Sequence, residues 1–144
     1  MQSLNTLLKR WANEDVGALP GVEASSVQAC FASLDSVATA DVIALYAEIG
    51  GMDKMDKEYW RHWSLSEIES ENKSPSPSGV LFADYMISCW CYRVKAVSQE
   101  VSAVYIDFFN DKNPTLVANS LEEFFSMYLK DPDSVLFGPP AEAQ

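Results

Sequence analysis

The sequence has few of the residues on which catalytic and metal sites depend. Its 144 residues include one histidine and three cysteines, and no Gly-x-Ser-x-Gly motif or glycine-rich phosphate loop occurs. No apolar run approaches the ~18 residues of a membrane span, and no basic and apolar leader indicates secretion. We therefore expect a cytoplasmic protein with no catalytic residue, metal, cofactor or membrane association.

Basic residues are also scarce. Ten Lys and Arg stand against 21 Asp and Glu, which gives a net charge of −11. Binding to a nucleic-acid backbone needs clustered positive charge, so this balance argues against nucleic acid as the main ligand. The same charge favours a basic protein partner, because complementary potentials promote association.

The cysteines and the single histidine leave one alternative open. An odd number of cysteines (Cys30, Cys89 and Cys91) is a poor disulfide framework, which favours a reducing compartment and a monomer. On one strand, Cys89 and Cys91 would point to the same face, where His62 could complete a metal or thiol site. We interpret all of these residues instead as structural, with the cysteines in the core.

The first third of the chain carries the apolar spacing of three helices. Stripes at i, i+3, i+4 and i+7 occur in residues 3–13, 25–34 and 39–49. Gly50 and Gly51 follow the third stripe, and we expect them to end that helix in the left-handed conformation that glycine adopts at little cost.

The second half favours a mainly antiparallel sheet. The stretches 80–86, 87–96 and 101–110 are rich in β-branched and aromatic residues, which is typical of strands. The first two adjoin closely enough to be a hairpin or one bent strand. Residues 115–118 predict a short edge strand, and the Pro-rich stretch 73–79 predicts a surface loop.

Two capping-box patterns predict the remaining helices. Ser66–Glu69 and Ser120–Glu123 each fit Ser-x-x-Glu, the second at the start of a closing helix. The fold class expected is α+β, with N-terminal helices, a mainly antiparallel central sheet and a C-terminal closing helix. We expect one domain over residues 1–144, with a frayed tail at 138–144.

The stretch 52–62 is the first candidate for binding a partner. If it is helical, Asp53, Asp56 and Trp60 share a face, where the acids would steer a basic partner and the tryptophan would anchor it. The alternative is a solvated loop with Trp60 packed beneath it. The candidate residues are Asp53, Asp56, Glu58, Tyr59 and Trp60.

A second candidate lies in the stretch 80–86. Asp84 alternates in phase with Val80 and Phe82, so its carboxylate must be hydrogen-bonded or lie at the rim of the sheet. One interpretation is a rim acid at the strand end. The other is a partner-contacting or site-organising acid beside Tyr85.

Four segments in order resemble the SUKH superfamily, which includes bacterial toxin-immunity proteins and related fungal cell-wall-synthesis regulators. Val42–Gly51 is similar to its helix ending in two glycines, and Trp63–Ile68 to its short strand leading into a Glu-Ile turn. Gly79–Tyr85 resembles the central strand and Val117–Phe124 the closing helix, within a matching region of 37–136. The resemblance implies a SUKH-like α+β domain that binds another protein and has no catalytic activity.

The family's typical bacterial role implies a function. The resemblance implies that the chain is an immunity protein that occludes a cognate toxin domain, often a nuclease, inside the producing cell. The alternative is a regulatory scaffold or adaptor that binds a host protein without any toxin.

Overall fold

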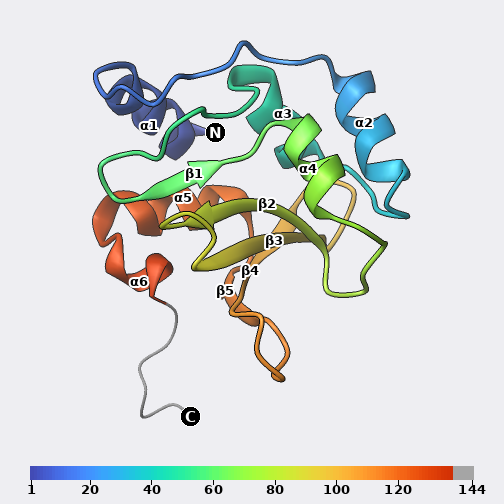
Figure 1. Cartoon of the computed structure of the whole chain (residues 1–144). Helices are drawn as coiled ribbons and strands as arrows, with labels where there is room; N and C mark the ends of the chain where they lie inside the picture. The colour runs from blue at the N-terminus through green and yellow to red at the C-terminus, as the bar shows by residue number, and fades with distance from the viewer. Residues whose placement is uncertain (138–144) are drawn as a thin grey trace.

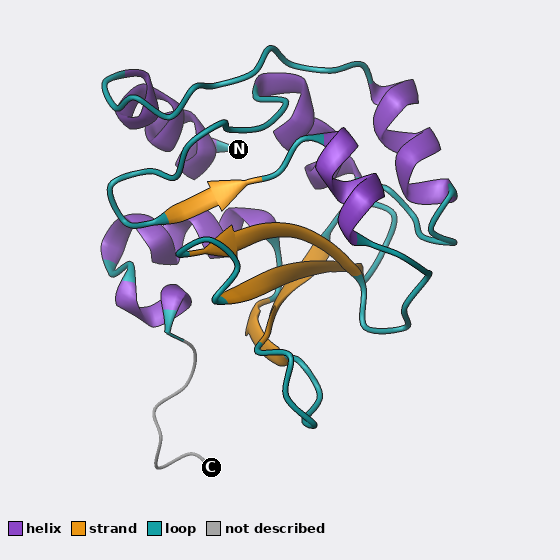
Figure 2. Ribbon diagram, viewed as in Figure 1, coloured by secondary structure: helices purple, strands orange, loops and turns teal. Residues whose placement is uncertain are grey.

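The computed structural model describes residues 1–137, and it confirms the α+β expectation (Figure 1). Helices precede a five-stranded antiparallel sheet, one more helix lies between its first two strands, and further helices follow it (Figure 2). The elements are α1 (Gln2–Ala12), α2 (Ala24–Ala32), α3 (Ala40–Glu48), β1 (Trp60–His62), α4 (Leu65–Glu71), β2 (Val80–Tyr85), β3 (Trp90–Ala96), β4 (Ser102–Asp107), β5 (Thr115–Ala118), α5 (Leu121–Lys130) and α6 (Asp133–Leu136).

The strands lie in the order in which the chain makes them. Each strand pairs antiparallel with the one before it, so the sheet runs β1-β2-β3-β4-β5. The short connections from β2 to β5 favour this neighbour pairing, whereas the longer connection from β1 to β2 contains α4. Of the two possibilities for residues 80–96, the hairpin is the correct one, and β5 forms the predicted edge strand.

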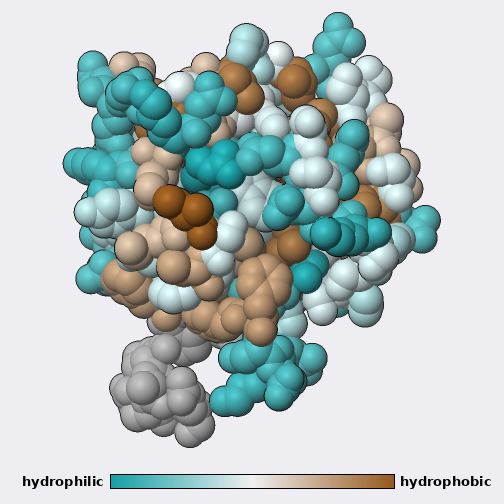
Figure 3. All heavy atoms as spheres, in the orientation of Figure 1, coloured by the Kyte–Doolittle hydropathy of each residue, from teal (hydrophilic) through white to brown (hydrophobic). Residues whose placement is uncertain are grey.

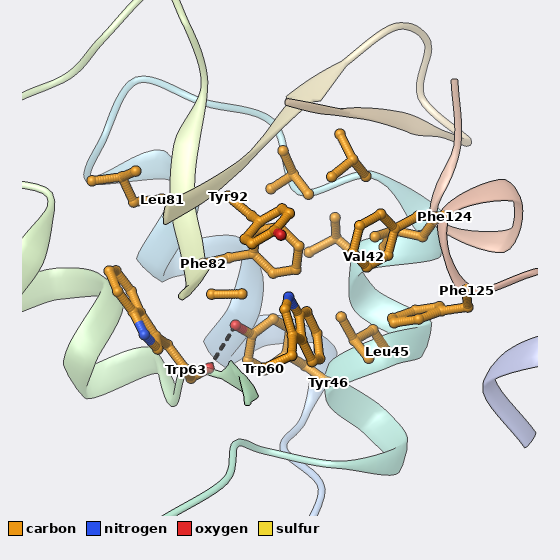
Figure 4. Packing of buried hydrophobic residues seen from close by; sticks show 14 of the residues in the cluster. Val42, Leu45, Tyr46, Trp60, Trp63, Leu81, Phe82, Tyr92, Phe124 and Phe125 are labelled. Carbon is orange, nitrogen blue, oxygen red and sulfur yellow. Dashed lines mark hydrogen bonds between the residues drawn. The ribbon is translucent and has the colours of Figure 1, made fainter. Parts of the chain in front are cut away.

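An aromatic core fills the space between one face of the sheet, α3 and α5 (Figure 4). Trp60 of β1 lies at its centre, with ring centroids 5.8 Å from Phe124 and 5.9 Å from Tyr128, both on α5. The hydroxyl of Tyr46 on α3 donates to the carbonyl oxygen of Trp63 at 2.8 Å, the dashed line in Figure 4. The predicted helical stripes therefore face one shared core.

The two glycines after α3 are required for a different reason from the left-handed helix end that the sequence predicts. The helix ends at Glu48, and the residue that follows, Ile49, is extended rather than left-handed. A Cβ on Gly50 would lie 2.2 Å from the carbonyl oxygen of Pro20, and one on Gly51 would lie 2.8 Å from the nitrogen of Ser64. The glycines are required because other segments of the chain pass too close for a side chain.

The capping box of α4 is displaced by two residues from the predicted one. Ser64, not Ser66, is the N-cap: its Oγ accepts from the nitrogen of Glu67 at 3.2 Å. The Glu67 carboxylate accepts in return from the nitrogen of Ser64 at 3.2 Å. Glu67 also pairs with Arg61 at 2.6 Å, and this ion pair favours the earlier box over the one that ends at Glu69.

The closing helix begins where the sequence predicts. Ser120 caps α5, with its Oγ accepting from the nitrogen of Glu123 at 3.0 Å. α1 lies against α5, and the nitrogen of Ser3 donates to Glu122 at 3.1 Å. The short helix α6 was not predicted, and the expected frayed tail at 138–144 lies outside the described residues. None of the helices within residues 1–137 has the length and apolar character needed to cross a membrane.

Candidate protein-binding surface

In the first predicted binding stretch, residues 52–59 form a loop with turns that leads into β1, so of the two alternatives the helical one is not the structure. The stretch folds back along β1 through backbone hydrogen bonds. The nitrogen of Met52 donates to the oxygen of His62 at 2.9 Å, and that of Asp56 donates to the oxygen of Trp60 at 2.9 Å. The shared helical face of Asp53, Asp56 and Trp60 therefore does not exist.

Trp60 is an interior residue and not an exposed anchor. Its side chain is 0% exposed, because β1 is a strand of the sheet and its inner face meets α5. The ring stacks on Trp11 of α1 with a centroid distance of 6.0 Å. Of the two interpretations of this stretch, the packing of Trp60 beneath a loop is the one that the structure has.

Asp56 is also buried, with 5% of its surface exposed. Its Oδ1 accepts from the nitrogens of Glu58 at 2.9 Å and Trp60 at 3.1 Å. Its Oδ2 accepts from Nε1 of Trp11 at 3.0 Å and from the hydroxyl of Tyr128. Burial raises the pKa of Asp56, and these hydrogen bonds oppose that rise. Asp56 thus joins α1, β1 and α5, and a partner does not reach it.

Asp84 and Tyr85 lie inside the molecule as well, with 3% and 6% of their surface exposed. The carboxylate of Asp84 accepts from Nε1 of Trp63 at 2.7 Å and pairs with Arg61 at 3.4 Å. The ring of Tyr85 stacks on Trp90 with centroids 4.9 Å apart. Asp84 is therefore not a rim acid; it holds the side chains of Trp63 and Arg61, which agrees with the site-organising interpretation.

Three of the seven predicted binding residues remain at the surface. Asp53 is exposed, Glu58 is partly exposed, and the side chain of Tyr59 is 51% exposed. Tyr59 immediately precedes β1, at the end of the sheet where β2 turns into β3. Exposed apolar side chains also lie at that end of the sheet.

Five large apolar or aromatic side chains are exposed at this end of the sheet, which we call the turn-end surface. Their exposed fractions are 51% for Tyr59, 46% for Met86, 80% for Ile87, 56% for Phe109 and 49% for Phe137. Figure 3 shows hydrophobic residues, in brown and tan, gathered on the lower left of one face of the molecule. Exposed apolar side chains that gather in this way mark protein-interaction sites.

Contacts between elements hold the turn-end surface together. The nitrogen of Met86 donates to the carbonyl oxygen of Tyr59 at 2.9 Å, which joins the β2–β3 turn to β1. Nε1 of Trp90 donates to the carbonyl oxygen of Leu136 at 2.8 Å, which fixes α6 against the sheet. Segments from distant parts of the sequence, the loop before β1, the β2–β3 turn and α6, are therefore held at the same end of the sheet.

Carboxylates lie beside this apolar surface. Burial first, then the nearby Asp133, and after it Tyr59, Cys89 and Glu58, raise the pKa of Tyr85. Asp133 belongs to α6 and Glu58 precedes β1, so acidic groups approach Tyr85 from two different elements. An apolar centre with an acidic rim complements a partner that is apolar in the middle and basic around it.

A hollow of about 500 Å³ opens beside the β2–β3 turn. Its charged groups are largely engaged within the chain, since Lys54 pairs with Asp15 at 2.7 Å and Arg61 pairs with Glu67. Its lining is Asp53, Lys54, Met55, Arg61, Asp84 and Ile87.

The histidine is structural in this arrangement. His62 is 0% exposed, and its Nε2 lies 3.1 Å from the carbonyl oxygen of Ile49. Burial lowers the pKa of His62 to about 4, so the imidazole is neutral at neutral pH.

The cysteines do not form the pair that the sequence suggested. Cys91 lies in β3 and is buried, whereas Cys89 lies in the turn and is exposed, so they share no strand face. Burial raises the pKa of Cys91 to about 12 and that of Cys30 to about 11, so these two thiols stay protonated at neutral pH. Within residues 1–137, no three His, Cys, Asp or Glu side chains are grouped so as to hold a metal ion.

Sequence reasoning missed four of the five residues of the turn-end surface: Met86, Ile87, Phe109 and Phe137. The β2–β3 turn contains no glycine, proline or asparagine, the residues that signal a turn. One signal was available for Met86 and Ile87. If residues 80–96 form a hairpin, the middle of that stretch must be its exposed turn.

The comparisons with known proteins add no relative. The chain matches no protein-family model, no curated protein and no solved structure. The resemblance to the SUKH superfamily therefore rests on the four sequence segments alone.

Proposed function

We propose that this chain is a non-catalytic protein-binding domain of the immunity type, which occludes a basic toxin domain with its turn-end surface. The observation that carries the proposal is the group of exposed apolar side chains beside the carboxylates of Glu58 and Asp133. Each of these side chains keeps between 46% and 80% of its surface exposed in the described chain.

The composition of the surface supports protein binding. Tyrosine, phenylalanine and methionine are enriched in the centres of protein interfaces, and a few such residues supply most of the binding energy. Tyr59, Met86, Phe109 and Phe137 belong to these residue types. They lie at the end of a sheet whose backbone is fixed by neighbouring strands, so little ordering is needed on binding.

The charge supports a basic partner. The net charge of −11 steers positively charged proteins towards this one and repels acidic ones. Toxin domains that cleave nucleic acid need basic surfaces to hold phosphates, so an acidic domain is suited to cover them.

The immunity role depends on the SUKH resemblance. The four resembling segments lie at α3, α4, β2 and the β5–α5 connection. The protonated thiols of Cys30 and Cys91 and the neutral His62 favour a non-catalytic role, because they lack the charged or activated form that nucleophilic chemistry uses.

Co-expression tests this proposal. The chain is produced together with the polypeptide encoded by the gene next to its own, and growth and complex formation by size exclusion are measured. We expect toxicity of the neighbour to be relieved and the two proteins to elute as one complex. A complex without any toxicity would favour the regulatory scaffold, and the absence of both effects would overturn the proposal.

A charge variant adds a kinetic test of the same proposal. Replacing Asp53 and Glu58 by Asn and Gln should slow association and flatten its dependence on salt, with dissociation changed less. The matched control replaces Glu23 and Glu48, two exposed acids on other elements, by Gln. Equal slowing by the two double variants would mean that net charge matters and the turn-end surface does not.

A further inference from the structure

The β2–β3 turn has a backbone conformation that its sequence does not favour. Met86, Ile87 and Ser88 have φ values of 49°, 54° and 62°, in the left-handed region. Glycine and asparagine adopt this region readily, whereas a β-branched residue such as isoleucine is a true outlier there. A residue in such a conformation costs on the order of 1–3 kcal/mol and persists only where its surroundings impose it.

The surroundings of the turn do impose it. At its base, the ring of Tyr85 stacks on that of Trp90, and the nitrogen of Cys89 donates to the oxygen of Tyr85 at 3.0 Å. On its β1 side, the nitrogen of Met86 donates to Tyr59 at 2.9 Å. The turn is thus held in one shape from two sides.

Ile87 contributes little to the stability of the folded domain. With 80% of its surface exposed, it is the most exposed of the large apolar residues in the described chain. An apolar side chain in water and in a disfavoured backbone conformation gives the isolated domain no stability. Its presence is explained if its partner lies outside the domain.

We propose that the β2–β3 turn is a preformed anchor, and that Ile87 inserts into an apolar pocket of a partner protein whose rim carries Lys or Arg. This inference rests on the proposed function and deepens it, since it names the residue that the partner must receive. A basic rim fits because the two bases of the hollow beside Ile87 are already paired, Lys54 with Asp15 and Arg61 with Glu67 and Asp84. Asp53 lines the same hollow and is exposed.

Two other occupants fit the apolar side chains but not the charge. A second copy of the chain would bring another −11 charge against the same acidic surface, and an anionic lipid surface would be repelled by it. A basic protein is the occupant for which both the apolar centre and the acidic rim are favourable.

Substitution of Ile87 tests the proposal. Ile87→Asn removes the apolar side chain, and asparagine tolerates the left-handed backbone, so the turn keeps its shape. The matched control is Val97→Asn, because Val97 is 66% exposed and lies after β3, in the β3–β4 connection. The binding probe is a catalytically inactive variant of the polypeptide encoded next to the gene, with kinetics measured on an immobilised surface.

We expect Ile87→Asn to weaken binding by about 30-fold or more, mainly through faster dissociation, as for a central anchor residue. Val97→Asn should stay within about twofold of the unsubstituted protein, because only the turn-end surface meets the partner. Thermal unfolding of Ile87→Asn should occur at an unchanged or higher temperature, which separates lost binding from lost folding.

Each other result has a defined meaning. If the unsubstituted chain binds the probe and Ile87→Asn binds within about threefold of it, the anchor is wrong and the proposed function stands. If the unsubstituted chain does not bind, the proposed function and the anchor both fall. Ile87-dependent binding to vesicles of phosphatidylcholine and phosphatidylglycerol, or Ile87-dependent dimerisation by light scattering, would also overturn the protein-partner assignment.

Discussion

Asp56→Asn should destabilise the domain by about 2–3 kcal/mol, a large effect for an exchange of nearly equal size. The amide keeps one oxygen for the backbone nitrogens of Glu58 and Trp60. Its other position becomes an NH₂ donor that faces two donors, Nε1 of Trp11 and the hydroxyl of Tyr128. The hydroxyl can turn and accept, but an indole nitrogen donates only, so a buried donor loses its partner.

The magnitude follows from these contacts. A hydrogen bond to a charged group contributes about 1.5–3 kcal/mol, and an unsatisfied buried donor costs about 1–3 kcal/mol. Burial of a charged carboxylate is unfavourable, which is why the pKa of Asp56 is raised. The neutral amide of asparagine avoids this cost, and the gain offsets part of the loss in stability. In a domain of this size, the loss corresponds to roughly 6–9 °C in the unfolding temperature.

Urea unfolding followed by circular dichroism is the assay, with equal slopes required for the comparison. Asp53→Asn is the matched control, because Asp53 is exposed, and it should change stability by less than about 0.5 kcal/mol. Tyr128→Phe removes one of the two side-chain donors and should cost less than Asp56→Asn. The reasoning is refuted if Asp56→Asn is as stable as Asp53→Asn.

The pH dependence of this variant has a definite sign. Because the folded-state pKa of Asp56 is raised above its unfolded value, the folded protein holds this proton more tightly. The resulting stability is present at pH values below the unfolded pKa and is lost as the pH rises through the folded one. The stability difference between the unsubstituted chain and Asp56→Asn should therefore be larger in acid and narrow towards neutral pH.

The remaining predictions concern other buried positions. The pKa of His62 is lowered to about 4, so the unfolded chain binds a proton that the folded one does not between about pH 6.5 and about pH 4. Stability should therefore fall by about 3 kcal/mol over this range as the pH drops. Urea unfolding at each pH should show a smaller fall for His62→Gln. Gly50→Ala should cost more than about 2 kcal/mol in thermal unfolding, because its Cβ would meet the oxygen of Pro20 at 2.2 Å, and an unchanged unfolding temperature would contradict this packing. Ser120→Ala should cost about 1 kcal/mol and Phe124→Ala about 3–5 kcal/mol in urea unfolding, and equal, near-zero effects would mean that α5 is not held as described.

Local patterns were enough to predict most of the fold. The stripes Leu4–Leu7–Trp11 and Val27–Cys30–Phe31 mark helix faces because apolar spacing and helical period coincide, and both sets are buried. Ser120 is the N-cap that the sequence predicts, although the Glu123 carboxylate accepts from the nitrogen of Asn119 and not from that of Ser120. At α4, Ser64 and Ser66 both fit the pattern, and the ion pair of Glu67 with Arg61, which decides between them, is a tertiary contact.

The candidate site was harder to predict because burial of a charged residue depends on distant partners. Asp56 is buried through Trp11 and Tyr128, which lie 45 and 72 residues away in the sequence. No local pattern reports contacts of that separation, so the sequence around Asp56 predicts a surface acid. The turn at Ile87 could not be predicted because its residue type points the other way. A β-branched residue is typical of strands, and the sequence does not reveal that its backbone is left-handed.

The packing of α1 against α5 has a consequence for synthesis. Ser3 meets Glu122, which lies 119 residues later in the chain. At roughly 5–20 residues per second, the ribosome needs about 6–24 s to deliver the helix that covers the apolar face of α1. During that time the face is open to chaperones and to other nascent chains, and the domain completes its core only when its last long helix has emerged.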